Sequence, residues 1–364
     1  MATLRQRTRP ESPYPAIISG CRREPNAVHT PVAGSRQSGI SIGAIEYFSY
    51  DSDNACVHAQ LAEMIADLVA QFPETQNYPR RIVCLTEETT ETIYLLGEQD
   101  RIAGVSGYTA RPPEARLKPR VSAFTTAKFD KILEVHPDLV LTFSDLQADL
   151  ARELIRRGVP VVAFNQRTVS EILEMIFFLG RILGCEAKAR SLVDRLIANL
   201  QAISLSASQF PRRPRVFFEE WKDPLISGIR WVEELIEIAG GEPLFPELKE
   251  AAFATDRIVP PDLVRERNPD VVIASWCGMK VNKDAIRSRP GWEAINAIRD
   301  HHIYEIKSTY ILQPGPAALT EGVQQLHFIL AKVCGGSVPS DIQPAERVDS
   351  ALELRKSHIL ITNP

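Results

Sequence analysis

The sequence has few of the residues that bind transition metals or cross-link a chain. Its 364 residues include six cysteines and seven histidines. No two cysteines form a Cys-x-x-Cys motif, and no two histidines have the i, i+3 or i, i+4 spacing that puts two ligands on one face of a helix. We therefore expect scattered buried thiols, and neither a disulfide framework nor a metal site.

The sequence also lacks a surplus of basic residues and a long apolar run. It has 42 Lys and Arg residues against 46 Asp and Glu residues, which gives a formal net charge of −4. Because neutralisation of phosphates supplies most of the affinity of nucleic-acid-binding proteins, this balance excludes a nucleic-acid partner. No apolar run approaches the roughly 18 residues that span a bilayer, so we predict no membrane-spanning helix.

Residues 1–79 form an N-terminal extension whose composition differs from that of the rest of the chain. Residues 1 to about 40 are rich in Arg, Pro, Ser and Gly and have no periodic apolar positions, which predicts disorder. Apolar residues at helical spacing from about 53 to 72 predict one amphipathic helix. The segment 18–21 (ISGC) matches the lipid-attachment box of bacterial lipoproteins, but prolines precede it instead of an apolar stretch. We therefore recognise no secretion signal and no transit peptide.

From residue 80 onward, short apolar strands alternate with amphipathic helices, a pattern typical of parallel sheets covered by helices. One helix, from 186 to about 208, contains no Pro or Gly and is about 33 Å long by the helical rise per residue, enough to connect two lobes. We predict an α/β fold with a first lobe at 80–185, a connecting helix at 186–210, a second lobe at 211–334 and a tail at 335–364.

Polar and aromatic residues follow the predicted strands at their carboxyl ends, where ligands bind in open parallel sheets. Aromatic faces beside amide and hydroxyl groups suit a large planar ligand with a polar periphery. The alternative for the two tryptophans among them is a place in the core, and for the asparagine a place in a turn. The candidate ligand contacts are Thr86, Glu87, Tyr108, Phe124, Ser144, Gln147, Asn165, Gln166, Glu219, Trp221, Trp276, Tyr310 and Gln313.

An enzyme would need a nucleophile with a base, or a pair of carboxylates. Glu87, Asp145, Glu219 and Cys277 are the candidates, but no motif such as GxSxG or HExxH connects them. No glycine-rich loop follows the first strand, where acidic residues would repel a phosphate. We therefore expect a binding protein, and a dinucleotide-dependent enzyme is disfavoured.

A set of short motifs carries a family resemblance. They are, in chain order, Thr89–Glu91 with the helix to Gly97, Ile102–Tyr108, Pro119–Phe124, Lys131–Leu141, Pro269–Val272, Arg289–Trp292 and Pro314–Pro316. In that order, residues 81 to about 333 resemble the solute-binding proteins of the ABC importers for iron-siderophores and vitamin B12. Within that family they resemble the cobalamin-binding branch.

The resemblance implies two Rossmann-like lobes with parallel sheets joined by one rigid helix, the helical-backbone type of class III. It implies a corrinoid ligand between the lobes, with aromatic side chains on the ring and Gln147, Asn165 and Gln166 at the peripheral amides, and no catalytic cofactor. It also implies a monomer that docks on an ABC permease through acidic residues, which correspond to Asp130 and Asp262. The alternative for these two is a charge that caps a helix.

Other ligands and settings fit the same scaffold. An anionic ferric siderophore would use Arg111, Arg167 and Arg230, and haem would use Tyr or His, whereas manganese or zinc binders need a histidine-rich set that this sequence lacks. An enzyme that processes a tetrapyrrole would use Glu87, Glu219 or Cys277. The family resemblance places the protein in the periplasm or elsewhere outside the cytoplasm; without a recognised signal, the alternative is a cytoplasmic corrinoid carrier or sensor.

Overall fold

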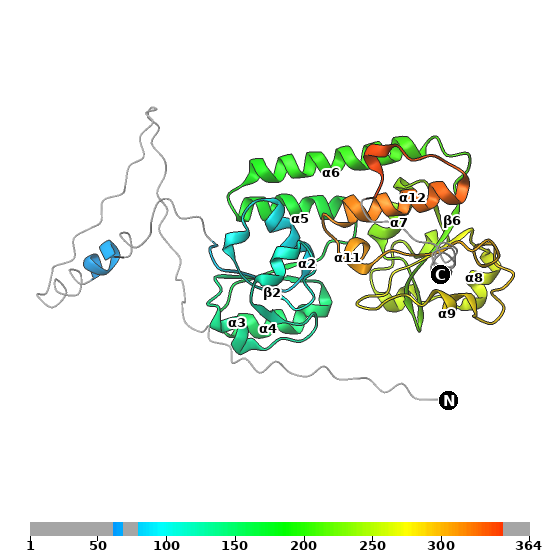
Figure 1. The fold of residues 1–364 in the computed structure, drawn as a ribbon. Coiled ribbons are helices and arrows are strands. Elements are labelled where there is room, and N and C mark those ends of the chain that lie inside the picture. The colour runs from blue at the N-terminus through cyan, green and yellow to red at the C-terminus, as the bar shows by residue number, and fades with distance from the viewer. Residues whose placement is uncertain (1–60, 68–78, 345–364) are drawn as a thin grey trace, which may run out of the picture. The chain divides into compact units, whose positions relative to one another are not determined.

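The computed structural model describes residues 61–67 and 79–344 (Figure 1). The chain divides into two compact units, Met1–Pro73 and Glu74–Pro364. The second unit contains all the candidate residues of the site, so the architecture below concerns this unit.

In the first unit the described residues form a short helix. Residues 61–67 are helical, and Leu61, Met64 and Ile65 are about half exposed on it. This helix lies within the one predicted over 53–72. The remainder of that predicted helix and the predicted disorder before it lie outside the described residues.

The first lobe of the second unit is built on a five-stranded parallel sheet, in the order β3-β2-β1-β4-β5. In the central strand β1, Ile82 and Cys84 pack into one hydrophobic cluster and Val83 into another, so both faces of the sheet are covered. The elements of this lobe are β1 (Ile82–Cys84), α2 (Glu87–Leu95), β2 (Ile102–Ser106), β3 (Arg120–Ser122), α3 (Phe129–Glu134), β4 (Leu139–Phe143), α4 (Ala148–Arg156), β5 (Val161–Phe164) and α5 (Val169–Ile182).

The second lobe has a mixed sheet in the order β10-β9-β6-β7, and β8 also pairs with β6. Only β7 runs antiparallel to its neighbour among the described strands. The elements are β6 (Arg215–Lys222), β7 (Leu225–Ser227), α7 (Arg230–Ile238), β8 (Glu242–Pro243), α8 (Pro261–Arg267), β9 (Val271–Ala274), α9 (Lys283–Arg287), α10 (Asn296–Arg299), β10 (Ile303–Glu305), α11 (Ser308–Ile311) and α12 (Val323–Cys334).

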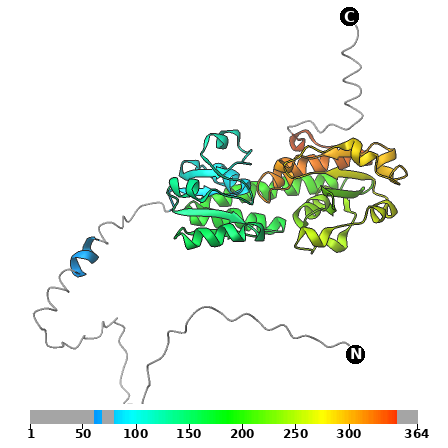
Figure 2. The same cartoon turned by 90° about the horizontal axis from the view of Figure 1, so that it is seen from below.

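A single helix, α6 (Glu186–Ala207), connects the two sheets, as the sequence predicts. Its buried side chains recur at helical spacing from Ala189 to Ile203 and pack on α5, α7 and α12. The helix crosses α5 closely, because a Cβ at Gly180 would lie 2.2 Å from the Cβ of Ala189. Figures 1 and 2 show α6 lying beside both α5 and α12, so one helix runs along both lobes.

The last helix, α12, is preceded by a turn of another helical type. Residues Ala318–Gly322 form a π-helical turn that leads into α12. The carbonyl of Leu319 in this turn accepts a hydrogen bond of 2.8 Å from Asn199 Nδ2 of α6. Glycine is required at the end of the turn, since a Cβ at Gly322 would lie 2.4 Å from the carbonyl oxygen of Tyr310.

The predicted fold class is therefore confirmed: an α/β protein with two sheets and a long connecting helix. The lobe boundaries at 80–185 and 211–334 stay a prediction. Within 61–67 and 79–344, no helix has both the length and the apolar character that crossing a bilayer requires.

Candidate functional site

The two lobes meet where α2 begins and where the chain passes from α11 to α12. The backbone N–H of Ala317 donates a hydrogen bond of 3.1 Å to Glu91 Oε2 of α2. Gly315 lies so close to the same helix that a Cβ there would be 2.5 Å from the Cβ of Glu88. We call α2 together with residues 313–321 the lobe junction.

A partly buried ionic network lies at the lobe junction. Arg111 Nε lies 2.9 Å from Glu91 Oε1, and Arg111 Nη2 lies 2.8 Å from Glu321 Oε1. The guanidinium also lies over the ring of Tyr310, 4.9 Å from its centroid. Burial raises the pKa of Glu91, and the adjacent Arg111 opposes that rise. The charge of Arg111 is thus balanced within the chain, by one carboxylate from each lobe.

Gln147, a predicted ligand contact, is fully buried and holds strand ends together. Its Nε2 donates to the carbonyl oxygens of Phe124 at 2.7 Å and Leu85 at 3.3 Å. Its Oε1 accepts from the backbone N–H of Phe143 at 2.9 Å. Because its side chain joins the ends of β1 and β4 to the segment after β3, the structure gives this amide a role within the fold.

Glu219 and Trp276 are also placed inside the second lobe. The side chain of Glu219 is fully buried and accepts hydrogen bonds from Arg289 at 2.6 and 2.8 Å and from Trp276 Nε1 at 3.1 Å. Trp276 is 2% exposed and packs in the cluster with Phe217 and Trp292. Trp276 is therefore a core residue, which was the alternative to its role as a ligand contact. Glu219 has the hydrogen-bond partners that a buried carboxylate needs.

Three further candidates are buried at the strand ends. Thr86 Oγ1 donates to Glu88 Oε1 at 2.5 Å, and Ser144 caps the turn that follows β4. Gln166 Nε2 donates to the carbonyl of Pro314 at 2.9 Å, across the lobe junction. These side chains shape the ends of the strands and fix the second lobe against the first.

The remaining candidates reach the surface at the strand ends of both lobes. Tyr108 is 58% exposed and Asn165 is exposed, while the others are half-buried. The indole N–H of Trp221 donates to the carbonyl of Asp223 at 3.0 Å, which fixes the orientation of its ring. The candidates that remain accessible to a ligand are Glu87, Tyr108, Phe124, Asn165, Trp221, Tyr310 and Gln313.

Two glutamates, Glu87 from the first lobe and Glu220 from the second, affect the Cys277 thiol. Burial, with a contribution from Glu88, raises the pKa of Glu87 to about 8. Cys277 is exposed at the surface, yet its surroundings raise the pKa of its thiol, first by partial desolvation and then by the charges of Glu87 and Glu220. Glu87 begins α2 in the first lobe, whereas Glu220 lies in β6 and Cys277 follows β9 in the second. Charges from both lobes therefore affect the pKa of this thiol.

Glu220 and its partner Arg257 are absent from the sequence-based candidates. The side chain of Arg257 is 1% exposed and lies 2.6 and 3.1 Å from the two carboxylate oxygens of Glu220. The pairing of β6 with β7 is irregular between Glu219 and Trp221, as at a β-bulge. Because side chains alternate between the two faces of a strand, the sequence could have placed Glu220 on the opposite face from Glu219 and Trp221. Only the fold shows which of these faces is buried in the lobe.

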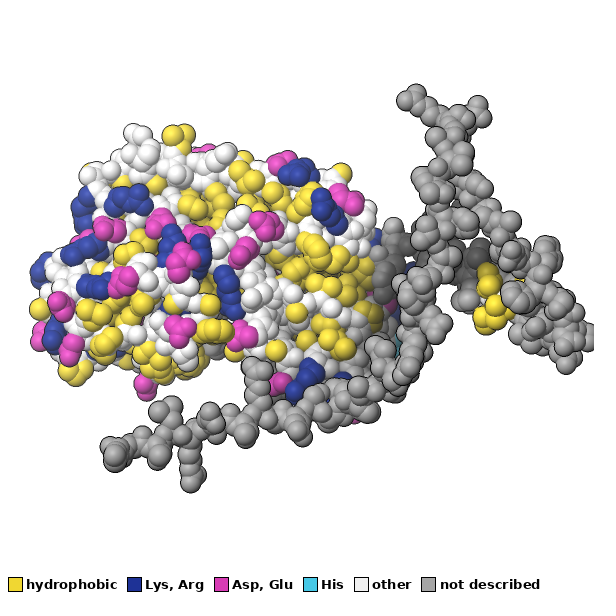
Figure 3. All heavy atoms as spheres, turned by 180° about the vertical axis from the view of Figure 1, so that it is seen from behind, with side chains coloured by type: hydrophobic (Ala, Val, Ile, Leu, Met, Phe, Trp, Pro, Cys, Tyr) yellow, Lys and Arg dark blue, Asp and Glu magenta, His cyan; other side chains and the backbone are white. Residues whose placement is uncertain are grey.

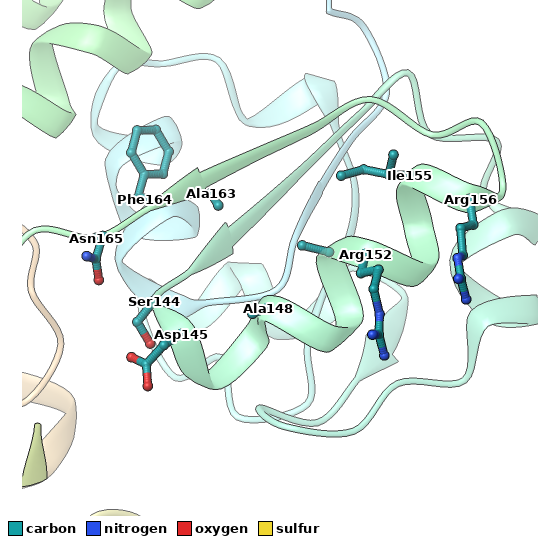
Figure 4. Close-up of a pocket in the computed structure, with 10 residues that line it drawn as sticks. Ser144, Asp145, Ala148, Arg152, Ile155, Arg156, Ala163, Phe164 and Asn165 are labelled. Carbon is teal, nitrogen blue, oxygen red and sulfur yellow. The ribbon is translucent and has the colours of Figure 1, made fainter. Parts of the chain in front are cut away.

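A separate pocket of about 580 Å³ lies between α4 and the edge strand β5. Figure 4 shows Ser144, Asp145 and Asn165 at one end of it, and Ile155 and Arg156 at the other. All its lining residues come from the first lobe, so this pocket is not shared between the lobes.

The predicted docking residues lie on the surface. Asp130 of α3 and Asp262 of α8 are exposed, and each occupies the second position of its helix. Asp262 pairs with Arg265 at 3.0 Å. Figure 3 shows that basic and acidic side chains are interspersed on the face opposite the view of Figure 1. Among the residues the structure describes, no group of three or more His, Cys, Asp or Glu side chains could hold a metal ion.

Comparison with known proteins identifies a family and a shared fold. A family model described as periplasmic binding protein matches residues 82–310. An uncharacterized ABC transporter substrate-binding lipoprotein of Bacillus subtilis is 27% identical over 271 residues, which cover 72% of this chain and 83% of the relative. A vitamin B12-binding protein of Vibrio parahaemolyticus is 25% identical over 243 residues, 66% of this chain and 85% of the relative. The apo structure of the haem-binding protein RhuT from Roseiflexus has the same fold, with a TM-score of 0.62, 22% identity and coverage of 70% of this chain and 99% of that one.

Proposed function

We infer the function of this chain from the premise that it belongs to the periplasmic binding protein family. The relatives reported above are substrate-binding proteins, so this chain is a solute-binding protein and not an enzyme. The hypothesis of a tetrapyrrole-processing enzyme, with Glu87, Glu219 or Cys277 in catalysis, is thereby excluded. Glu219 is in any case fully buried in an ion pair with Arg289.

We propose that the solute is a corrinoid bound between the lobes. The observation that carries the proposal is the set of aromatic side chains at the strand ends, Tyr108 and Phe124 from the first lobe and Trp221 and Tyr310 from the second. Aromatic faces on two sides suit a flat macrocycle, which buries a large apolar area against them. The vitamin B12-binding relative supports this choice of macrocycle.

The amide groups that remain at the surface support the same proposal. Asn165 is exposed and Gln313 is half-buried. Asn165 Oδ1 accepts from Arg167 at 3.0 Å, which leaves its N–H donors for a ligand. An amide both donates and accepts, so it pairs well with the amide side chains around a corrin ring. Gln147 and Gln166 were expected in the same role, but Gln147 bonds within the chain through both ends of its amide, and Gln166 does so through its Nε2 alone.

Haem is the second candidate, and two observations favour it. The RhuT structure shares the fold, and Tyr108 presents an exposed phenol of the kind that ligates haem iron. Against haem stands its pair of propionates, which are usually met by cations.

Calorimetric titration with cyanocobalamin, haem and a ferric siderophore tests the proposal directly. We expect one saturable site for cyanocobalamin. The double change Tyr108→Ala with Trp221→Ala should weaken it at least tenfold, because two stacking faces are lost. The control is Phe177→Ala, since Phe177 lies under Arg181 and Arg190 on the helical layer. Saturable binding of haem without any of cyanocobalamin would replace the corrinoid with haem.

We further propose that the protein works outside the cytoplasm and delivers its ligand to an ABC permease. The relatives named as an ABC transporter lipoprotein and as a vitamin B12-binding protein support this setting. Fractionation of producing cells, with N-terminal sequencing of the mature chain, tests the location. Recovery of the whole protein with the cytoplasm would favour the cytoplasmic carrier instead.

A further inference from the structure

We propose that Glu88 is a pH-sensitive switch at the lobe junction. While its carboxyl group is protonated, the backbone of the second lobe packs over it. Once the group ionises, its charge has to reach water and the lobes separate at this contact. The inference goes beyond the proposed function, because it concerns the opening of the lobes and does not depend on which solute binds between them.

Glu88 lies directly beneath the backbone of the second lobe. It is 1% exposed, and a Cβ at Gly315 would lie 2.5 Å from its Cβ and 3.7 Å from its Cγ. Two positions beyond Gly315, the N–H of Ala317 donates to Glu91, which is three residues along α2 from Glu88. The segment around Gly315 thus rests on two side chains of the same helix. Moving this segment away would uncover Glu88.

The carboxyl group of Glu88 has little to compensate a negative charge. Within the described part of the chain, its side chain has one hydrogen-bond partner, Thr86 Oγ1 at 2.5 Å, and no ion pair. A buried carboxylate without a cation is costly, and such a group takes up a proton instead. The closed junction therefore favours the protonated form of Glu88.

The neighbouring charges act in the same direction. Arg111 bonds to Glu91 and Glu321, so its charge is already shared by two carboxyl groups. The Cys84 thiol stays neutral, since burial raises its pKa to about 12. The charged and titratable groups around Glu88 and this thiol are Glu87 and Glu91 of α2, Arg111 and Lys118 from the segment between β2 and β3, and Glu321 of the second lobe. Neither of the two cations pairs with Glu88 in the described structure.

The direction of the switch follows from the proton affinities of the two forms. Burial raises the pKa of Glu88 to about 7, against the lowering effect of the bond from Thr86, and Glu91 adds to the rise. An exposed glutamate has a pKa of about 4.5. The closed form therefore has its full advantage below about pH 4.5 and loses it as the pH rises to about 7. Opening, which a solute-binding protein needs for release, is thus easier near neutral pH than in acid.

Hydrogen–deuterium exchange, read by mass spectrometry on peptides that cover residues 313–321, measures the opening. The amide of Ala317 is protected while it bonds to Glu91, so its exchange rate reports on the lobe junction. Because the chemical exchange rate itself depends on pH, wild type is compared with the isosteric Glu88→Gln at each pH. We expect the ratio of the two rates, wild type over variant, to rise at least tenfold from pH 5 to pH 8, since glutamine cannot ionise.

The matched control is Glu174→Gln, an exposed residue of α5. Its ratio to wild type should be the same at both pH values. A ratio of wild type to Glu88→Gln that is also the same at pH 5 and pH 8 would overturn the proposal, because Glu88 would then be a buried residue without a role in opening.

Thr86→Val gives a second test that does not need the Glu88 variant to fold. Removing the Thr86 hydroxyl should raise the pKa of Glu88 further, so ionisation in the closed form becomes more costly. Up to about pH 6 this variant and wild type should keep a constant ratio of exchange rates, and between pH 7 and pH 9 the variant should become several-fold faster. A constant ratio over the whole range would show that the bond from Thr86 acts on packing alone, and would also overturn the switch.

Discussion

Replacement of Arg111 by methionine should destabilise the protein through the lobe junction. The change keeps the length of the side chain but leaves Glu91 and Glu321 without their shared cation. Breaking a buried pair by removing one partner costs about 3–5 kcal/mol. The side chains of Glu91, Arg111 and Glu321 are 9%, 26% and 28% exposed, so solvent screening reduces the effect and we expect about 2–4 kcal/mol. For a unit of this size that is a fall in Tm of roughly 3–8 °C.

The dependence of this loss on pH distinguishes charge from lost packing. In the folded protein the pKa of Glu91 is raised, so its contribution to stability is present at low pH and is lost as the pH rises through that value. Without Arg111, which lowers it, the pKa of Glu91 rises further. The difference in Tm between wild type and Arg111→Met should therefore be larger at pH 8 than at pH 5.

Calorimetric or fluorescence-monitored melts at the two pH values measure both quantities. The matched control is Arg152→Met, which removes an exposed pair with Asp149 and should change stability by no more than about 0.5 kcal/mol. The reasoning would be refuted if Arg111→Met lost no more stability than Arg152→Met. It would also be refuted if the fall in Tm of Arg111→Met were the same at pH 5 and pH 8.

The remaining predictions concern the junction, the docking surface and a buried acid. Gly315→Ala places a methyl group 2.5 Å from a side-chain carbon of α2, so melts should show a loss of about 1–3 kcal/mol; an unchanged Tm would contradict the close approach. Asp130→Lys with Asp262→Lys should reduce ligand transfer to the permease in reconstituted vesicles at least tenfold without changing ligand affinity, whereas the exposed control Asp149→Lys should transfer normally; normal transfer by the double variant would make the two aspartates helix-capping charges only. Burial raises the pKa of Glu233 to about 8, above its value in the unfolded chain, so stability should fall as pH rises from 6 to 9 and Glu233→Gln should reduce that fall; identical pH profiles would refute it.

Local sequence patterns were sufficient for the elements that hold the fold together. The short apolar runs after residue 80 predicted strands, and β1 and β4 are strands whose residues are all buried. Helical periodicity without Pro or Gly predicted α6 nearly to the residue. The short strands β7 and β8, of three and two residues, were missed because so few positions carry no detectable period.

The candidate site was harder, because strand ends carry both ligand contacts and structural polar groups. Gln147 and Asn165 look alike in sequence, since each is an amide just after a strand. Only long-range bonds separate them: Gln147 reaches carbonyls 23 and 62 positions away, whereas Asn165 is exposed. In β6, Glu219 and Glu220 are adjacent residues that pair with different arginines. Glu219 pairs with Arg289 and Glu220 with Arg257, and both arginines are remote in sequence.

The same reasoning decides what composition says about a ligand. An arginine near a binding site attracts an anion only if its charge is not already balanced, and the sequence does not show that balance. Arg111 finds its two carboxylates 20 and 210 positions away, so no local window reveals that it is paired. Once the fold pairs it, the guanidinium can bind an anion only by displacing one of those carboxylates. A count of basic residues near the strand ends therefore says little about the charge of a ligand until the fold shows which of them are already paired.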